Sequence, residues 1–253
     1  MGNAFTALAD DAEAGFWNPA GLVQWQGVRF FASTKASDRE NYAFDSKCVA
    51  YSYRDVAFFW GNKIALRVED GDTPDFNYYS LARKLNPYLA IGSSVKFRRR
   101  HPCEYYQFFG HSPGYDLGVL WKPNARSSGG VLIQNMGDGD RWISITTFGF
   151  ASKVLNTSLL SVDLAVLFDD GATLEPHVGW EWQAFHWMAL RAGMSDSHPT
   201  AGVGLKLPIP SAWGQRVGSR AKGRHGCPPL RIDYAWIHDA KGNAHFLSGQ
   251  VGL

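Results

Sequence analysis

The sequence predicts an all-β protein of about fourteen antiparallel strands, and three observations support this fold class. Apolar and polar residues alternate along most of the chain, as in residues 115–121 (YDLGVLW) and 160–169 (LSVDLAVLFD). A period of two is typical of a strand whose two faces meet different surroundings. Turn-forming Gly, Asp, Asn and Pro separate the alternating segments, as at residues 86–87 and 241–243. After residue 20, no segment has the length and periodicity of a helix.

The first element is predicted to be a short helix. Asp10, Asp11 and Glu13 stand among alanines, as is common in the first turns of a helix. Asn18 and Pro19 should end this helix, because proline disfavours helical geometry in the residue before it. The strands follow, and we expect them to begin near Gly27, Cys48, Val56, Tyr78, Leu89, Tyr115, Gly130, Trp142, Leu159, Glu175, Phe185, Thr200, Leu230 and Ala244.

Composition excludes several classes of protein. The 253 residues carry a net charge of only +2, which does not indicate a nucleic-acid partner. No apolar run approaches the roughly 18 residues of a transmembrane helix. The three cysteines, Cys48, Cys103 and Cys227, have no CxxC spacing, and the chain has no GxSxG or HExxH motif. We therefore expect neither an enzyme nor a cofactor or metal site.

The alternation alone fits two architectures. A soluble sandwich turns its apolar face to a shared core, whereas a membrane barrel turns it to lipid. Three features favour the barrel: short turns join successive strands, the chain ends on a strand at residues 245–253, and aromatic residues gather at strand ends as in a membrane-interface girdle. The aromatic residues concerned are Phe58, Phe59, Trp60, Tyr105, Tyr106, Trp121, Trp180, Trp182, Trp187 and Trp236.

The beginning of the chain resembles a known signature. Residues 2–11 (GNAFTALADD) and 17–22 (WNPAGL) are similar to the N-terminus of the FadL-like superfamily of bacterial outer-membrane barrels. Later segments are more similar to its PorV/PorQ branch. These segments are residues 115–118, 130–135 (GVLIQN), 177–181, 190–193, 200–205 and 233–235, with His245 and Ser248 near the end. The chain departs from the family in its short length, its final Leu253 and the absence of a signal peptide at Met1, which we interpret as a trimmed or misassigned start.

The resemblance implies a fourteen-stranded transmembrane barrel in the bacterial outer membrane. Residues 1–26 would form a helical hatch inside the lumen, and residues 27–253 would form the barrel. The motif residues of the hatch would be Asp10, Asp11, Trp17, Asn18, Pro19 and Gly21. The acidic residues of the hatch would either complement a helix dipole or pair with basic side chains of the lumen.

Charged residues fall on the lumen-facing positions of several predicted strands. They are Lys96, Arg98, Asp116, Asp163, Glu181, Arg191, Lys206, Arg231 and Asp233. Because unpaired buried charge is costly, they would form either a network of salt bridges that stiffens the lumen or a polar path or ligand site. This set contains no continuous apolar lining, which argues against transport of long acyl chains.

One long basic stretch, residues 208–229, interrupts the strand pattern. If both termini lie in the periplasm, as the resemblance implies, this stretch lies there too, with the tight turns near Asp55, Asn86 and Ala184. Its basic residues Arg216, Arg220, Lys222 and Arg224 would contact a periplasmic partner, or the stretch is a solvated insertion.

Three functions follow from these observations. The first is a structural subunit of a cell-envelope or secretion assembly, with outer-membrane lipid and envelope proteins as partners, because the PorV/PorQ family includes components of type IX secretion. The alternative is an outer-membrane transporter of hydrophobic small molecules, which would bind a hydrophobic ligand or lipid. The second alternative is a soluble β-rich binding protein.

Overall fold

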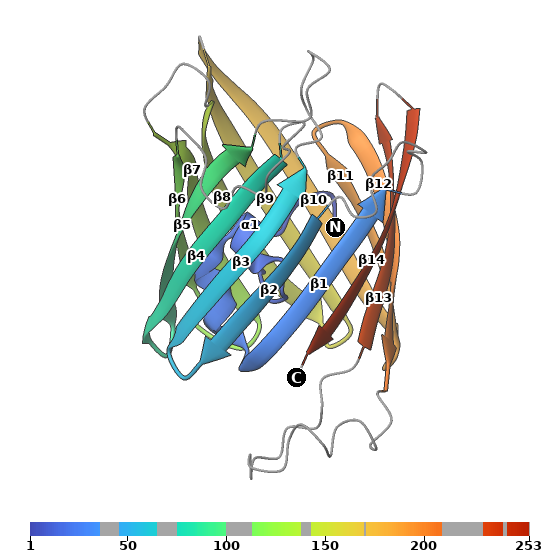
Figure 1. The fold of residues 1–253 in the computed structure, drawn as a ribbon. Coiled ribbons are helices and arrows are strands. Elements are labelled where there is room, and N and C mark those ends of the chain that lie inside the picture. Colours follow the sequence, from blue (N-terminus) through green and yellow to red (C-terminus); the bar gives the residue numbers. More distant parts are fainter. Residues whose placement is uncertain are drawn as a thin grey trace.

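The computed structural model describes residues 1–35, 46–64, 75–99, 113–137, 143–169, 171–208, 230–239 and 242–252. They form a closed barrel in which each strand pairs antiparallel with its neighbours in sequence and β1 pairs with β14 (Figure 1). The strands are β1 (Gly27–Lys35), β2 (Ser46–Tyr53), β3 (Val56–Ile64), β4 (Asp75–Asn86), β5 (Leu89–Arg99), β6 (Gly114–Trp121), β7 (Ser127–Met136), β8 (Ser144–Leu155), β9 (Ser158–Asp169), β10 (Gly171–Phe185), β11 (Met188–Ser195), β12 (His198–Leu207), β13 (Leu230–Asp239) and β14 (Gly242–Gly252). The predicted fold, an antiparallel barrel of about fourteen strands, is confirmed.

The strands begin within three residues of the expected positions, except β10, which begins at Gly171 instead of near Glu175. Phe185 was expected to begin a strand, but it is the last residue of β10, and the turn lies at His186 and Trp187 instead of near Ala184. A shift in the β10–β11 register between Trp182 and Phe185 carries β10 further than the sequence pattern indicates.

The outer surface of the barrel is apolar. In β6, Tyr115, Leu117 and Trp121 are each about half exposed, whereas Asp116 between them is buried. Large apolar side chains are exposed on most other strands as well. Exposed aromatic residues also flank the short turns at one end of the barrel; they are Tyr53, Tyr88, Trp121, Phe185 and Trp187. Apolar side chains outside and polar ones inside are the pattern of a lipid-facing barrel.

None of the helices in the described residues is long and apolar enough to cross a membrane.

The N-terminal segment contains less helix than expected, and its acidic residues lie before the helix instead of within it. The helix α1 spans only Ala14–Trp17, with Glu13 at its N-cap, so Asp10 and Asp11 precede it. A 3-10 helix, η1, follows at Pro19–Gln24. Asn18 between them is extended, with a φ of −139°, which agrees with the expected end of the helix before Pro19. Since α1 has no acidic residue in its first turn, the structure gives no support to a dipole role for these carboxylates.

The hydrophobic core lies inside the barrel. Phe16, Ala20 and Leu22 of the N-terminal segment pack with lumen-facing residues of β1–β6, among them Phe59 and Leu120. The ring of Phe16 meets Phe59 and Tyr78 edge-on, with centroids 4.9 and 5.1 Å apart. One side of the lumen is therefore filled by apolar packing between the N-terminal segment and the wall.

Candidate functional site: a cavity beside the N-terminal hatch

Residues 1–26, called the hatch below, lie inside the barrel and contact the wall at several heights (Figure 1). Asp163 of β9 accepts hydrogen bonds from the backbone N–H groups of Phe5 and Thr6, at 3.0 and 2.7 Å. Ser128 of β7 donates to the carbonyl of Ala7 at 2.7 Å. Because these bonds use backbone groups of an irregular segment, they replace the partners that a helix or sheet would supply.

Asn18 joins two parts of the hatch to the wall. Its fully buried side chain donates from Nδ2 to the carbonyls of Thr6 at 2.9 Å and of Val119 in β6 at 3.0 Å. Its Oδ1 accepts from the N–H of Ala20 at 3.1 Å and so caps η1. This single amide therefore fixes both the fold of the hatch and its position against β6.

Glycines of the wall make room for the hatch. A Cβ at Gly118 would overlap Asn18 Oδ1, and one at Gly130 would overlap the carbonyl of Thr6. The same close approach recurs along the lumen face at Gly61, Gly92, Gly149, Gly179 and Gly193. A lumen face built of glycine lets the hatch backbone lie directly on the strands.

The remaining motif residues of the hatch differ in their surroundings. Gly21 packs on the backbone of Ala9, and Pro19 is fully buried. Trp17 is half-buried, and the Lys63 ammonium of β3 lies 4.6 Å from its ring centroid. Asp10 is exposed, whereas Asp11 is buried with its carboxylate 3.8 Å from Arg231.

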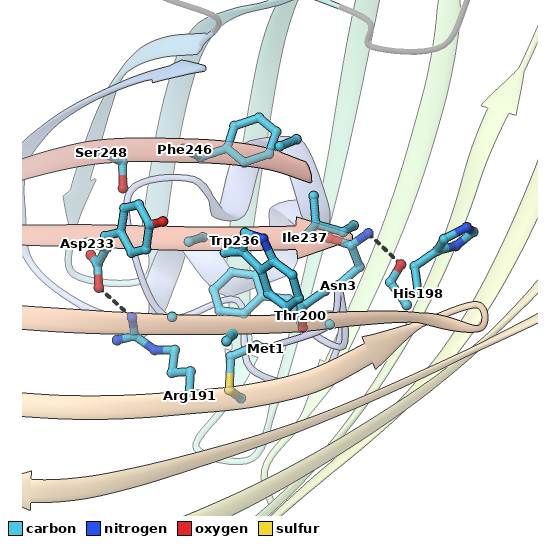
Figure 2. A pocket seen from close by; sticks show the side chains of 18 of the residues that line it. Met1, Asn3, Arg191, His198, Thr200, Asp233, Trp236, Ile237, Phe246 and Ser248 are labelled. Atoms are coloured by element: carbon cyan, nitrogen blue, oxygen red, sulfur yellow. Dashed lines mark hydrogen bonds and ion pairs between the residues drawn. The ribbon is translucent and has the colours of Figure 1, made fainter. Parts of the chain in front are cut away.

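The predicted lumen charges fall into two groups. Lys96 and Asp116 form a buried pair at 2.8 Å on β5 and β6. On the opposite side, Arg191 pairs with Glu181 at 2.6 Å and with Asp233 at 2.5 Å, as the close view of the cavity shows for Asp233 (Figure 2). Gly204 leaves space for this group, since a Cβ there would meet both Arg191 and Asp233.

Further members of the charged set join or lie apart from these groups. Arg231 extends the second group, with Nε 2.7 Å from Asp233. Lys206 donates to Gln183 at 3.3 Å, and Asp163 is the anchor of the hatch described above. The backbone of Arg98 lies in β5 opposite Phe76, and its side chain lies outside the described atoms.

The basic stretch expected to contact a partner, with Arg216, Arg220, Lys222 and Arg224, lies outside the described residues.

The hatch carboxyl groups have raised pKa values. Burial raises the pKa of Glu13, and the neighbouring carboxylate of Asp11 raises it further, against the opposing effect of Lys63. Burial also raises the pKa of Asp11, although the positive charge of Arg231 acts in the other direction. Both carboxyl groups are therefore easier to protonate in the docked hatch than in water.

A cavity of about 760 Å³ lies between the hatch and the wall formed by β11–β14 and β1 (Figure 2). Lumen-facing residues from three adjacent strands form two rows across its wall. Thr200, Ile237 and Ala244 make one row, and Gly202, Ala235 and Phe246 make the other. Phe5 and Trp17 of the hatch also line the cavity, as do the carboxyl groups of Asp11, Glu13 and Asp233.

Sequence reasoning missed this apolar wall. Only charged residues were assigned to the lumen face. Ala235, Ile237 and Phe246 were therefore left out, although they lie on the same face as Asp233. A signal was present, because Ala244 and Phe246 on one face of the strand are apolar, as is Leu247 on the other. Among the described residues, no cluster of His, Cys, Asp and Glu is placed to hold a metal ion.

No protein-family model matches the sequence, and no curated relative matches it either. Solved structures do match the fold. A FadL homologue of Pseudomonas aeruginosa aligns with a TM-score of 0.61 and 11% identity, over 98% of this chain and 96% of that chain. The toluene transporter TbuX of Ralstonia pickettii aligns with a TM-score of 0.62 and 12% identity, over 100% and 98%. The monoaromatic hydrocarbon channel CymD aligns with a TM-score of 0.59 and 10% identity, over 98% and 94%.

These similarities bear on the sequence-based resemblance in two ways. They agree with the FadL-like part of it, and they do not show the narrower PorV/PorQ assignment. At sequence identities of 10–12%, these matches show a shared fold, and this shared fold covers nearly the whole chain. The chain therefore has the fold of the FadL-type bacterial outer-membrane barrels.

Proposed function

We propose that this chain is an outer-membrane channel that takes small hydrophobic molecules into the cavity beside the hatch. The observation that carries the proposal is the cavity itself, which has an apolar wall of Ala235, Ile237 and Phe246 and hatch aromatics opposite. Its volume of about 760 Å³ lies in the range of small-molecule sites. Two of the matching structures are a toluene transporter and a monoaromatic hydrocarbon channel, which supports a ligand of that size.

This proposal replaces the scaffold function that the sequence favoured. The scaffold function depended on the PorV/PorQ assignment and on the basic stretch, and neither gains support from the described residues. The alternative hypothesis, a transporter of hydrophobic small molecules, agrees with the cavity and with the similarity in fold to a hydrocarbon channel and a toluene transporter.

Uptake of radiolabelled toluene by cells that express the chain tests this function. We expect uptake above that of cells with an empty vector, and we expect Ala235→Trp to abolish most of the difference because the indole fills the cavity. Ala192→Trp is the matched control, since Ala192 is exposed on the outer face of β11. Uptake that equals the vector control, or that Ala235→Trp leaves unchanged, would contradict the proposal.

A further inference from the structure

The cavity combines an apolar wall with one buried hydroxyl group that has no partner. Thr200 lies in the same row of the wall as Ile237 and Ala244. Its Oγ1 is buried and makes no hydrogen bond in the described structure. A buried hydroxyl without a partner is destabilising, so a ligand that supplies a hydrogen-bond partner would stabilise it.

Thr200 can present this hydroxyl to the cavity. The residue lines the cavity and is half-buried as a whole. Rotation by about 120° about χ1 moves the hydroxyl of threonine into the position that the methyl group occupied, while the methyl group moves to the position of the Cβ hydrogen. Because Oγ1 has no protein hydrogen bond to lose, this rotation breaks no hydrogen bond of Thr200 Oγ1. A ligand with a hydroxyl group would therefore gain a partner that a hydrocarbon cannot use.

The charges around the cavity disfavour an anionic ligand. Arg191 is already bound by the carboxylates of Glu181 and Asp233, and Arg231 lies beside Asp233 and Asp11. Asp11, Glu13 and Asp233 also line the cavity. A carboxylate ligand would have to displace Glu181 or Asp233 from Arg191, and it would be repelled by whichever of these two carboxylates remained.

We infer that the cavity selects neutral aromatic molecules that carry a hydroxyl group, such as simple phenols, with the ring on the apolar wall and the hydroxyl on Thr200. This inference rests on the proposed function, because it assigns a ligand class to the same cavity. It separates this chain from a general hydrocarbon channel, for which the hydroxyl would confer no advantage.

Three ligands of one shape test the inference: p-cresol, toluene and p-toluate, which differ only in one substituent. Their affinities for the purified full-length chain in detergent are measured by titration calorimetry at neutral pH. We expect p-cresol to bind about five- to tenfold more tightly than toluene, the effect of one neutral hydrogen bond, and p-toluate to bind most weakly. Thr200→Val should remove the advantage of p-cresol and leave toluene within about twofold.

Two control variants complete the test. Thr200→Ser keeps the hydroxyl and should keep the preference for p-cresol. Thr146→Val changes a threonine on the outer face of β8 and should alter nothing. Equal binding of toluene and p-cresol, or a preference that survives Thr200→Val, overturns the inference and leaves the hydrocarbon-channel function standing. Tightest binding of p-toluate overturns the inference, and failure of all three ligands to bind overturns both proposals.

Discussion

Glu13 and Asp11 place two carboxyl groups of the hatch inside the barrel, close to Lys63, Arg231 and Asp233. Burial raises the pKa of both groups, so the docked hatch binds protons more tightly than a released one. Docking is then most stable below the ordinary carboxyl pKa of about 4 and weakens as the pH rises toward the raised values. The hatch is consequently expected to loosen in alkaline and not in acidic solution.

Cys48 provides a probe for this pH dependence, because its thiol is buried in the lumen and donates to the carbonyl of Ala12 in the hatch at 3.3 Å. With Cys103 and Cys227 replaced by serine, we expect thiol labelling of the otherwise native chain to exceed that of its Glu13→Gln form. The ratio of the two labelling rates, that of the native Glu13 chain divided by that of Glu13→Gln, should grow from about pH 5 to about pH 8, because glutamine cannot ionise. The ratio also cancels the pH dependence of the labelling reaction itself.

Asp10 supplies the control for this measurement. It lies next to Asp11 but is exposed, so Asp10→Asn should change the labelling ratio with pH far less than Glu13→Gln does. A ratio for Glu13→Gln that stays constant over the same range would show that these carboxyl groups do not govern the docking of the hatch.

At the scale of elements, the position of the hatch depends on strands that carry glycine on the lumen face. In β6, Gly118 faces Asn18 and Pro19, and a Cβ there would overlap Asn18 Oδ1. We expect Gly118→Ala to push Asn18 off its partners and to weaken hatch docking by about 1–3 kcal/mol, the usual cost of overpacking. Hydrogen exchange of the hatch amides measures this loss, since the strands themselves remain paired.

The next strand offers a matched control for Gly118→Ala. Gly129 of β7 lies on the outer face, where the nearest atom to a new Cβ would be 3.6 Å away in Trp121. Gly129→Ala should therefore leave hatch exchange unchanged. Equal exchange in the two variants would mean that the hatch does not depend on close contact with β6.

The strands were predictable because their signal is local. Alternation in β6 follows from one buried and one exposed face, and short turns mark the ends of most strands. The turn at His186 and Trp187 was placed too early, near Ala184, because it lacks Gly, Pro, Asn and Asp and because the register shift after Trp182 conceals the end of β10. Local residue patterns do not report a bulge of this kind.

The candidate site was predictable only in part. Alternation placed Glu181, Arg191 and Asp233 on one face, but not in contact. Arg191 and Asp233 lie 42 residues apart in sequence, and their pairing depends on the register of β11–β13. The cavity depends in addition on where the hatch stops filling the lumen. Tertiary contacts such as those of Asn18 with Thr6 and Val119 set that position, and the periodicity of the sequence does not indicate contacts of this kind.

At the scale of the whole molecule, the barrel closes without the hatch. The pairing of β1 with β14 runs from Arg29 opposite Gly252 to Lys35 opposite Phe246, and every strand has two partners. Closure removes the unpaired edges that a lipid environment does not tolerate. The hatch instead fills the lumen, where its core contacts with β1–β6 add stability to a sheet that is already complete.

Deletion of residues 2–18 separates these two contributions. We expect the shortened chain to remain a folded barrel, seen as a heat-dependent shift on gels, with a lower melting temperature because Phe16 and its neighbours are lost from the core. In a planar lipid bilayer, the deletion should convert a nearly closed protein into an ion-conducting one. A folded deletion variant that does not conduct would contradict this expectation, and would show that the ion pairs around Arg191 close the lumen by themselves.

Adding Arg191→Ala to the deletion then distinguishes the hatch from these ion pairs as the barrier to ions. The substitution leaves Glu181 and Asp233 without the cation that holds them together.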